Sequence, residues 1–192
     1  MRITTSFITL ALAALVTAGC QCKSCNTKVA EIADDGSTIA AYDESNGKAT
    51  NNEMTITEMH IKDIDGNDHS LRDEIAKNKI TIVDFWASWC GPCRAEMPEV
   101  KALYDKYHAT KGFDVVGLSF DQKKEAWVAC IQRMDLPWHH LSDLKGWDCV
   151  AAQVYGVNSI PFTLLIGPDG RIVAAGLDAE GLAKKLAEIY GE

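Results

Sequence analysis

Two cysteines stand two residues apart in the run Trp89-Cys90-Gly91-Pro92-Cys93. Thiols at this spacing can close a disulfide and open it again, which is two-electron chemistry that needs no cofactor. The apolar run at residues 80–87 directly precedes them, is interrupted by Asp84, and predicts a buried strand. We therefore expect a redox-active pair between the end of a buried strand and the start of a helix.

Composition narrows the classes of function. The chain has 192 residues, of which 47% are hydrophobic, enough for one domain of ordinary size and some additional segments. Its net charge of −8 and the lack of a basic stripe exclude nucleic acid as a partner, because binding phosphates needs clustered Lys and Arg. Nothing in the sequence indicates an obligate dimer, so we expect a monomer.

The N-terminus has the pattern of an export signal at residues 1–19. Arg2 precedes an apolar stretch at residues 7–18, which is shorter than the roughly 20 residues of a spanning helix. The run Thr17-Ala18-Gly19-Cys20 resembles the bacterial lipobox, whose cysteine is lipidated, although Thr17 stands where Leu is usual. We expect Cys20 to carry a lipid anchor; plain secretion with cleavage near Ala18 is the alternative.

Residues 20–52 lack sustained periodicity and predict a flexible tether, followed by a folded domain at residues 53–192. Export places the domain where disulfides persist, outside the cytosol. We therefore expect an extracytoplasmic, periplasmic protein that is held at a membrane by its lipid. A dithiol enzyme in that compartment either acts as an oxidant or receives electrons across the membrane.

The order of predicted elements indicates an α/β fold. Residues 55–64 alternate and are followed by a turn at 65–68, which predicts an N-terminal hairpin, with Ser70 capping a short helix. Beyond the strand at 80–87 we expect a helix after Cys90 that contains Pro98, a strand at 113–120 and a helix at 125–134. A loop-like insertion at 136–145, a helix at 147–155 and strands at 162–166 and 171–175 should follow. We expect a last helix, capped by Asp178, whose Leu182, Leu186 and Ile189 face inward. Crossovers followed by a hairpin predict a mixed sheet with helices on both faces.

The run from Val83 to Arg94, together with Ile160-Pro161, resembles the thioredoxin superfamily. Within it, the chain is most similar to the membrane-anchored TlpA/ResA-like oxidoreductases, which are allied to the AhpC/TSA families. The N-terminal hairpin, Glu96 three residues after Cys93, and an apparent central insertion at residues 119–147 favour this branch. The resemblance covers about residues 55–190 and implies a thioredoxin fold.

Each cysteine of the pair has a predicted role. Cys90 is the attacking thiol, because a helix N-terminus stabilises its thiolate and lowers its pKa. Cys93 is the more buried resolving thiol. The alternative is a structural pair or half of a zinc site, but zinc would need two further suitably spaced ligands, and the five histidines are scattered in the sequence. We therefore expect no metal and no cofactor.

Two acidic residues are candidates for proton transfer. Asp84 interrupts an apolar strand, so burial should raise its pKa and let it take the Cys93 proton through water. The alternative is a purely structural Asp bonded to backbone. Glu96 lies one turn beyond Cys93, and the resemblance implies that it tunes the cysteine pKa values. A solvated helix carboxylate is the alternative for Glu96.

The resemblance also implies a substrate-docking edge. It places a cis peptide bond at Ile160-Pro161 beside the disulfide, with Trp89 as an apolar platform and Gly91-Pro92 between the thiols. A core aromatic is the alternative for Trp89. Outside this edge, Cys130 and Cys149 either pair with each other or are small buried hydrophobes, and Cys22 and Cys25 receive no role.

Three functions compete at this point. The first is a reductase in which Cys90 and Cys93 reduce disulfides of exported proteins, with electrons supplied by a membrane thiol transporter; in the resembled group the targets include apocytochromes c. The second is a thiol peroxidase of AhpC/TSA type using Cys90, which Ala87 disfavours because that chemistry needs Thr or Ser three residues before the cysteine. The third is a binding module with a stable disulfide.

Overall fold

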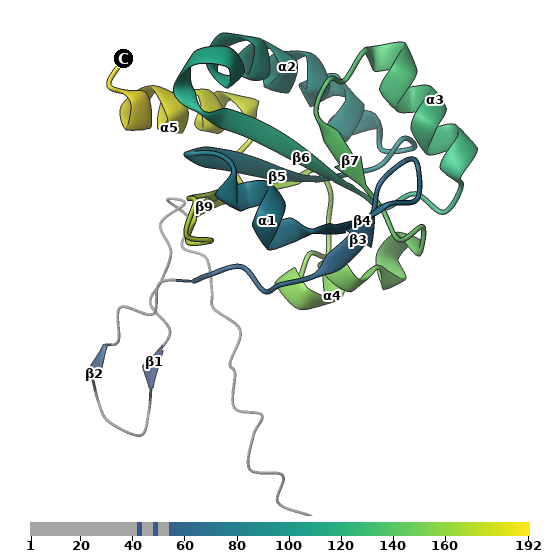
Figure 1. The fold of residues 1–192 in the computed structure, drawn as a ribbon, viewed down its shortest axis with the longest axis horizontal. Coiled ribbons are helices and arrows are strands. Elements are labelled where there is room, and N and C mark those ends of the chain that lie inside the picture. Colours follow the sequence, from purple (N-terminus) through teal and green to yellow (C-terminus); the bar gives the residue numbers. More distant parts are fainter. Residues whose placement is uncertain (1–41, 44–47, 50–53) are drawn as a thin grey trace, which may run out of the picture.

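The computed structural model describes residues 42–43, 48–49 and 54–192 (Figure 1). The expected export signal at 1–19, the lipidation site Cys20, and the tether thiols Cys22 and Cys25 lie outside the described residues. Within the expected tether, β1 (Tyr42–Asp43) pairs antiparallel with β2 (Lys48–Ala49). None of the helices in the described ranges has the length and apolar character that crossing a membrane requires.

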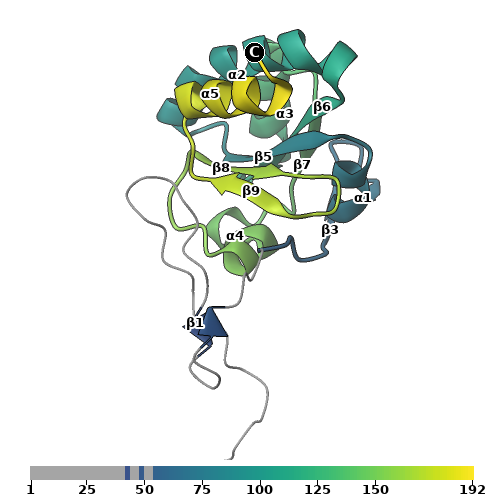
Figure 2. The same ribbon diagram turned by 90° about the vertical axis from the view of Figure 1, so that its left-hand side faces the viewer.

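A five-stranded mixed sheet organises the domain in the order β7-β6-β5-β8-β9. Strands β5, β6 and β7 run parallel, whereas β8 is antiparallel to β5 and β9 is antiparallel to β8. Helices α2, α3 and α5 lie over one face and α4 over the other (Figures 1 and 2). The element bounds are β5 (Ile80–Trp86), α2 (Gly91–Lys111), β6 (Phe113–Ser119), α3 (Lys124–Met134), β7 (His139–Leu141), α4 (Val150–Tyr155), β8 (Phe162–Ile166), β9 (Ile172–Ala175) and α5 (Ala179–Tyr190).

The central strand β5 explains why this sequence needs two helical layers. All seven of its residues are buried, as expected for a central strand that has helices on both faces of its sheet. Above it, α2 turns a buried stripe toward the sheet, formed by Met97, Val100, Leu103 and Tyr107. The helix expected after Cys90 is confirmed, and α2 continues through Pro98 as one helix.

The predicted N-terminal hairpin is confirmed. Strand β3 (His60–Lys62) pairs antiparallel with β4 (Asp68–Ser70), and Ser70 then caps α1 (Leu71–Ala76) by accepting the Asp73 N–H at 3.1 Å. The hairpin is fastened to the edge of the central sheet because the Ser142 N–H donates to the Lys62 carbonyl at 2.9 Å. A bridge between Asp63 and Leu141 adds to this attachment.

Three local predictions were wrong. The loop expected at residues 136–145 contains β7, whose His139-His140-Leu141 run has little strand character and is held by pairing with β6. The helix expected at 147–155 is divided at Cys149 into a 3₁₀ turn (Gly146–Asp148) and α4. In α5, Leu182 and Leu186 are buried as predicted, but Ile189 is exposed near the helix end.

Candidate active site

The disulfide joins Cys90 and Cys93 at the start of α2. Cys90 is the N-cap residue: its backbone is extended and its sulfur accepts the Cys93 N–H at 3.2 Å. Both residues are buried, with Cys90 the more exposed at 5% against 1% for Cys93, the order expected from the sequence. A sulfur in this position faces the positive end of a 21-residue helix, which favours a thiolate once the disulfide is reduced.

Asp121 fixes the loop that presents Cys90. The Ser88 N–H donates to the Asp121 carboxylate at 2.8 Å, and the Ser88 hydroxyl donates to its second oxygen. The Ser119 hydroxyl also donates to Asp121, at 2.8 Å. This buried carboxylate therefore ties the end of β6 to the residues before Cys90. Asp121 was not predicted as a site residue, although an acid directly after an apolar strand is a signal in the sequence.

The Ile160–Pro161 peptide bond is cis, as predicted. It lies directly before β8, and the carbonyl oxygen of Ile160 is 3.9 Å from the Cys90 sulfur. The fold thus brings together two segments that are far apart in the sequence. A substrate backbone that reached the Cys90 sulfur would pass beside this bend.

Asp84 lies in the middle of β5, between Gly117 of β6 and Thr163 of β8 in register. The side chain is buried, and its Oδ2 atom has no hydrogen-bond partner. Burial, reinforced by the negative charge of Glu96, raises the pKa of Asp84 to about 7. The predicted direction of this pKa shift is confirmed.

Glu96 is half-buried on α2. Burial raises its pKa, and the carboxylates of Asp178 and Glu99 add to the effect. Asp178 is itself engaged as the N-cap of α5, accepting the Gly181 N–H at 2.8 Å. Asp84 and Glu96 are therefore two electrostatically coupled acids, both of which hold a proton more tightly than ordinary carboxylates.

Exposed aromatic side chains border the disulfide. Trp89 is 53% exposed, so the alternative of a core aromatic is wrong. Trp147, which the sequence analysis did not single out, is 46% exposed and lies 6.4 Å from Trp89 between ring centroids. It rests edge-on against Phe120 at 5.0 Å. Val150, three residues after Trp147 in the chain, is also exposed. A pair of exposed tryptophans in contact is typical of a binding site.

The other two described cysteines do not form a second disulfide. Cys130 and Cys149 are both free and buried, so the alternative in which they pair is wrong and that of two small buried hydrophobes is confirmed. The Cys130 sulfur packs 3.8 Å from the Met134 sulfur.

Similarity to known proteins agrees with this site. A family model described as thioredoxin-like matches residues 78–172. Thiol-disulfide oxidoreductase ResA of Bacillus thuringiensis is 33% identical over 113 residues, which cover 59% of this chain and 62% of that protein. This chain thus aligns with less than two thirds of the length of that relative. Thioredoxin-like protein YneN of Bacillus subtilis is 34% identical over 116 residues, covering 60% of this chain and 65% of that one.

Solved structures extend the match over nearly the whole described domain. A thiol-disulfide oxidoreductase from Bacteroides fragilis has a TM-score of 0.66 and 30% identity, covering 71% of this chain and 99% of that one. A second thiol-disulfide oxidoreductase, from Bacteroides vulgatus, has a TM-score of 0.59 and 36% identity, covering 70% of this chain and 87% of that one. The chain belongs to the thioredoxin superfamily, in the group of ResA- and TlpA-like proteins.

Proposed function

We propose that this protein is an extracytoplasmic thiol–disulfide oxidoreductase that reduces disulfides of exported proteins through Cys90 and Cys93. One observation carries the proposal: the disulfide lies at the N-terminus of α2, with the cis-proline bend 3.9 Å from the Cys90 sulfur and exposed Trp89 directly before Cys90 in the chain. A purely structural disulfide would need neither an exposed aromatic neighbour nor a backbone bend against its sulfur.

The reaction uses the two electrons of the reduced pair. The Cys90 thiolate attacks one sulfur of a target disulfide, forms a mixed disulfide and releases the first target thiolate. Cys93 then loses its proton and attacks the Cys90 sulfur. The Cys90–Cys93 disulfide forms, and the second target sulfur leaves as a thiolate. The target gains two electrons, and the enzyme becomes oxidised.

Asp84 is the proposed acceptor of the Cys93 proton. A pKa near 7 suits a group that must take up and release a proton at neutral pH. The proposed transfer runs through a water molecule, so direct contact between Asp84 and Cys93 is not required. Glu96 is proposed to tune this exchange, since its charge raises the pKa of Asp84.

The docking surface indicates the kind of target. Trp89 and Trp147 offer flat apolar contact beside the disulfide, and the backbone at Ile160–Pro161 offers pairing for an extended strand. The preferred target is therefore an extended, partly apolar segment around a disulfide, such as an unfolded exported protein. Apocytochromes c are one such target implied by the resemblance, and Gly91 and Pro92 complete the surface.

The supply of electrons follows from the proposed location. A lipid on Cys20 and a tether at residues 20–52 would keep the domain at residues 53–192 close to a membrane. A membrane thiol-transfer protein could then reduce the Cys90–Cys93 disulfide after each cycle. The protein is proposed to act as a monomer without a cofactor.

A thiol peroxidase is the weaker candidate. Ala87, three residues before Cys90, is buried and has no hydroxyl to bind a peroxide. Peroxide consumption by the purified protein that is lost in Cys90→Ser would favour it.

The first test is the equilibrium reduction potential of the Cys90–Cys93 pair. The measurement uses the full chain with Cys20, Cys22 and Cys25 replaced by Ser, so that other accessible thiols do not exchange. A value near that of thioredoxin, about −270 mV, supports a reductase, whereas one near about −120 mV indicates an oxidant.

Trapping identifies the targets. Cys93→Ser should accumulate mixed disulfides with exported proteins, because the resolving thiol is missing. The double variant Cys90→Ser/Cys93→Ser is the matched control and should trap none. Equal trapping by both variants would contradict the proposal.

A further inference from the structure

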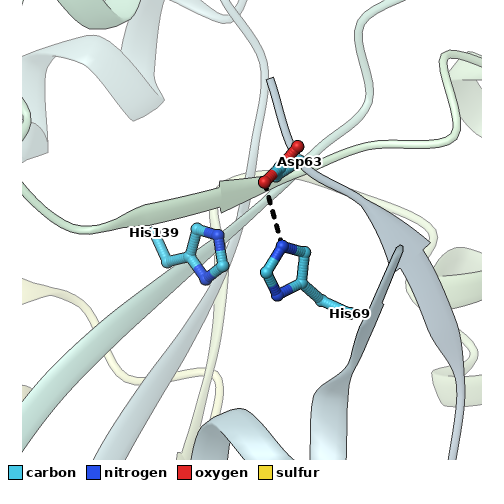
Figure 3. Close-up of side chains that lie close together, drawn as sticks. All are labelled: Asp63, His69 and His139. Atoms are coloured by element: carbon cyan, nitrogen blue, oxygen red, sulfur yellow. Dashed lines mark hydrogen bonds and ion pairs between the residues drawn. The ribbon is translucent and has the colours of Figure 1, made fainter. Parts of the chain in front are cut away.

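Three side chains with metal-binding atoms meet at the edge of the domain that carries the N-terminal hairpin. Asp63 follows β3, His69 lies in β4 and His139 begins β7. One ligand atom from each lies within 4.8 Å of the other two. Figure 3 shows the three side chains turned toward one another across the gap between the hairpin and the sheet edge.

The geometry of this group is close to that of a metal site. Asp63 Oδ2 is 2.9 Å from His69 Nε2, and the rings of His69 and His139 meet edge-on with centroids 4.3 Å apart. Tetrahedral coordination with bonds of about 2.0–2.1 Å places ligand atoms roughly 3.3 Å apart. Small side-chain adjustments would therefore suffice to surround a cation.

Glu74, on α1, faces both histidines from the other side. Its Oε1 lies 3.1 Å from His69 Nδ1, and its Oε2 lies 3.4 Å from His139 Nδ1. His69 Nδ1 is hydrogen-bonded to Glu74, and His139 Nδ1 lies within ion-pair distance of the same carboxylate. Nε2 is then the nitrogen of each ring that remains for a cation, and in His69 this nitrogen is hydrogen-bonded to Asp63 in the metal-free protein. Metal-ligating histidines characteristically donate their other ring N–H to such a carboxylate, which fixes the tautomer and the ring orientation.

Asp63 is also held in place before any cation arrives. Its Oδ1 accepts the N–H groups of Asp65 and Asn67 at 2.8 and 2.9 Å, and its Oδ2 accepts the Asn67 side-chain amide at 2.9 Å. The side chains of Asp63 and Glu74 are only 9% and 12% exposed, whereas His69 and His139 are 23% and 32% exposed. The carboxylates of Asp63 and Glu74 are thus the more buried side of the group, whereas the two histidines are accessible to solvent.

We propose that Asp63, His69 and His139 bind one divalent transition-metal cation of the Zn²⁺ class, with Glu74 as a positioning residue. Two imidazoles and one carboxylate are a donor set that suits Zn²⁺. Water would occupy the fourth coordination position. The cation takes the place of the proton that lies between Asp63 Oδ2 and His69 Nε2 in the metal-free protein.

The position of the site implies a structural role. Its ligands come from the hairpin and from β7, which are otherwise joined at this point by the Asp63–Leu141 bridge and the neighbouring Ser142–Lys62 hydrogen bond. A bound cation would lock the hairpin against the sheet edge. The site involves neither Cys90 nor Cys93, so the inference does not rest on the proposed redox function.

Zinc titration in competition with a chromophoric chelator tests the proposal. The full chain is used with its disulfide oxidised and its accessible thiols blocked by iodoacetamide, so that sulfur ligands do not contribute. We expect one Zn²⁺ per chain and a higher melting temperature with Zn²⁺ than with EDTA. His139→Gln should weaken binding by at least about tenfold, and Glu74→Gln by roughly 10- to 100-fold.

His60→Gln is the matched control. His60 lies on the same hairpin, is exposed and contacts Asp68 rather than the proposed ligands, so this variant should bind Zn²⁺ like the parent. Bound Co²⁺ should show visible d–d absorption without a sulfur-to-metal charge-transfer band.

Four outcomes would overturn the site: no Zn²⁺ binding by the parent, unchanged affinity in both His139→Gln and Glu74→Gln, a loss in His60→Gln equal to that in His139→Gln, or a charge-transfer band. Circular dichroism in EDTA verifies that each variant is folded. If His139→Gln is not folded, Glu74→Gln provides the decisive comparison with the parent.

Discussion

Cys90 and Cys149 cap the N-termini of two helices in the same way. The Cys90 sulfur accepts the N–H of Cys93 at 3.2 Å, and the Cys149 sulfur accepts the N–H of Ala152 at 3.3 Å. In both cases the capping residue has an extended backbone and the N–H donor lies three residues later. Local backbone geometry therefore does not distinguish the redox site from an ordinary helix cap.

The surroundings distinguish them. Cys90 begins a 21-residue helix, whereas α4 after Cys149 has six residues. The third residue after Cys90 is a second cysteine, and the third after Cys149 is Ala152. Burial raises the pKa of the Cys149 thiol, and the charge of Asp143 adds to this. A reactive thiol thus needs a resolving partner and a long helix, besides a cap position.

Aspartates anchor both capping segments. Asp121 receives the Ser88 N–H before Cys90, and Asp143 receives the Val150 N–H at 3.1 Å after Cys149. Asp121 is buried and also binds Ser119, whereas Asp143 is half-exposed. The redox loop is therefore held more firmly than the loop around Cys149.

The largest contrast is expected from removing each sulfur. Cys90→Ser should lower the rate of disulfide reduction by at least about 10³-fold, since the attacking nucleophile is lost. Cys149→Ser should leave the rate within about twofold, because a buried cap does not take part in exchange. Reduction of insulin disulfides with dithiothreitol as electron donor measures both. Comparable losses in the two variants would remove the distinction between the caps.

Asp84→Asn should slow the release of product by roughly 10²-fold, the lower range for a positioned acid–base group. Single-turnover decay of the mixed disulfide measures this step. Asp143→Asn, beside the other cap, is the matched control and should change the step by less than about twofold. An unaltered rate in Asp84→Asn would remove its proposed role.

The same variant has a predicted effect on stability. In the unfolded chain Asp84 ionises near its ordinary value of 3.8, but in the folded protein its pKa is about 7. Between about pH 4 and pH 7 the unfolded state releases this proton and the folded state keeps it. The free energy of unfolding of the parent therefore falls as pH rises through this range. Asp84→Asn should be more stable than the parent by on the order of 2–4 kcal/mol above pH 7 and show no such gain below pH 4. Urea unfolding across this range measures the difference.

Thiol accessibility should follow the same comparison. In the reduced protein near neutral pH, a maleimide should label Cys90 at least about tenfold faster than Cys149, because burial raises the pKa of the Cys149 thiol, whereas Cys90 caps the long helix α2, whose N-terminus favours a thiolate. Peptide mapping after timed quenching separates the two sites. Cys149 should become reactive only on unfolding in urea. Equal labelling rates in the native state would contradict the assignment of Cys149 as inert.

The smallest expected effect is the loss of stability on replacing Asp121 or Asp143, the aspartates that hold the two capping segments. Asp121→Ala should destabilise the fold by about 1–3 kcal/mol, because it leaves buried polar groups of Ser88 and Ser119 without an acceptor. Asp143→Ala should cost less than about 1 kcal/mol, since its partners can bind water. Urea midpoints compare the two. A larger loss in Asp143→Ala would reverse the ranking of the two loops.

Much of the molecule was predictable because its signals are local. The seven-residue apolar strand β5, the cap at Ser70, the cap at Asp178 and the hairpin of β8 and β9 were all placed from short patterns. Strand β7 was not, because its two histidines have little strand propensity and only pairing with β6 makes them a strand. The same applies to the 3₁₀ turn before Cys149.

The candidate site divides in the same way. Cys90 and Cys93 were apparent from their spacing, and Asp84 from its position inside an apolar run. Asp121 and Trp147 were not, because each acquires its role through a residue distant in the sequence, Ser88 for one and Trp89 for the other.

The sequence by itself determined the redox pair, the strand and helix that hold it, and the direction of the Asp84 pKa shift, since these depend on neighbours a few residues away. Only the tertiary structure decided that Cys130 and Cys149 stay apart, that Trp147 reaches Trp89, and that Asp63, His69 and His139 converge. Those contacts join segments separated by long stretches of chain. Their geometry is set by how the sheet and hairpin pack, which no local pattern encodes.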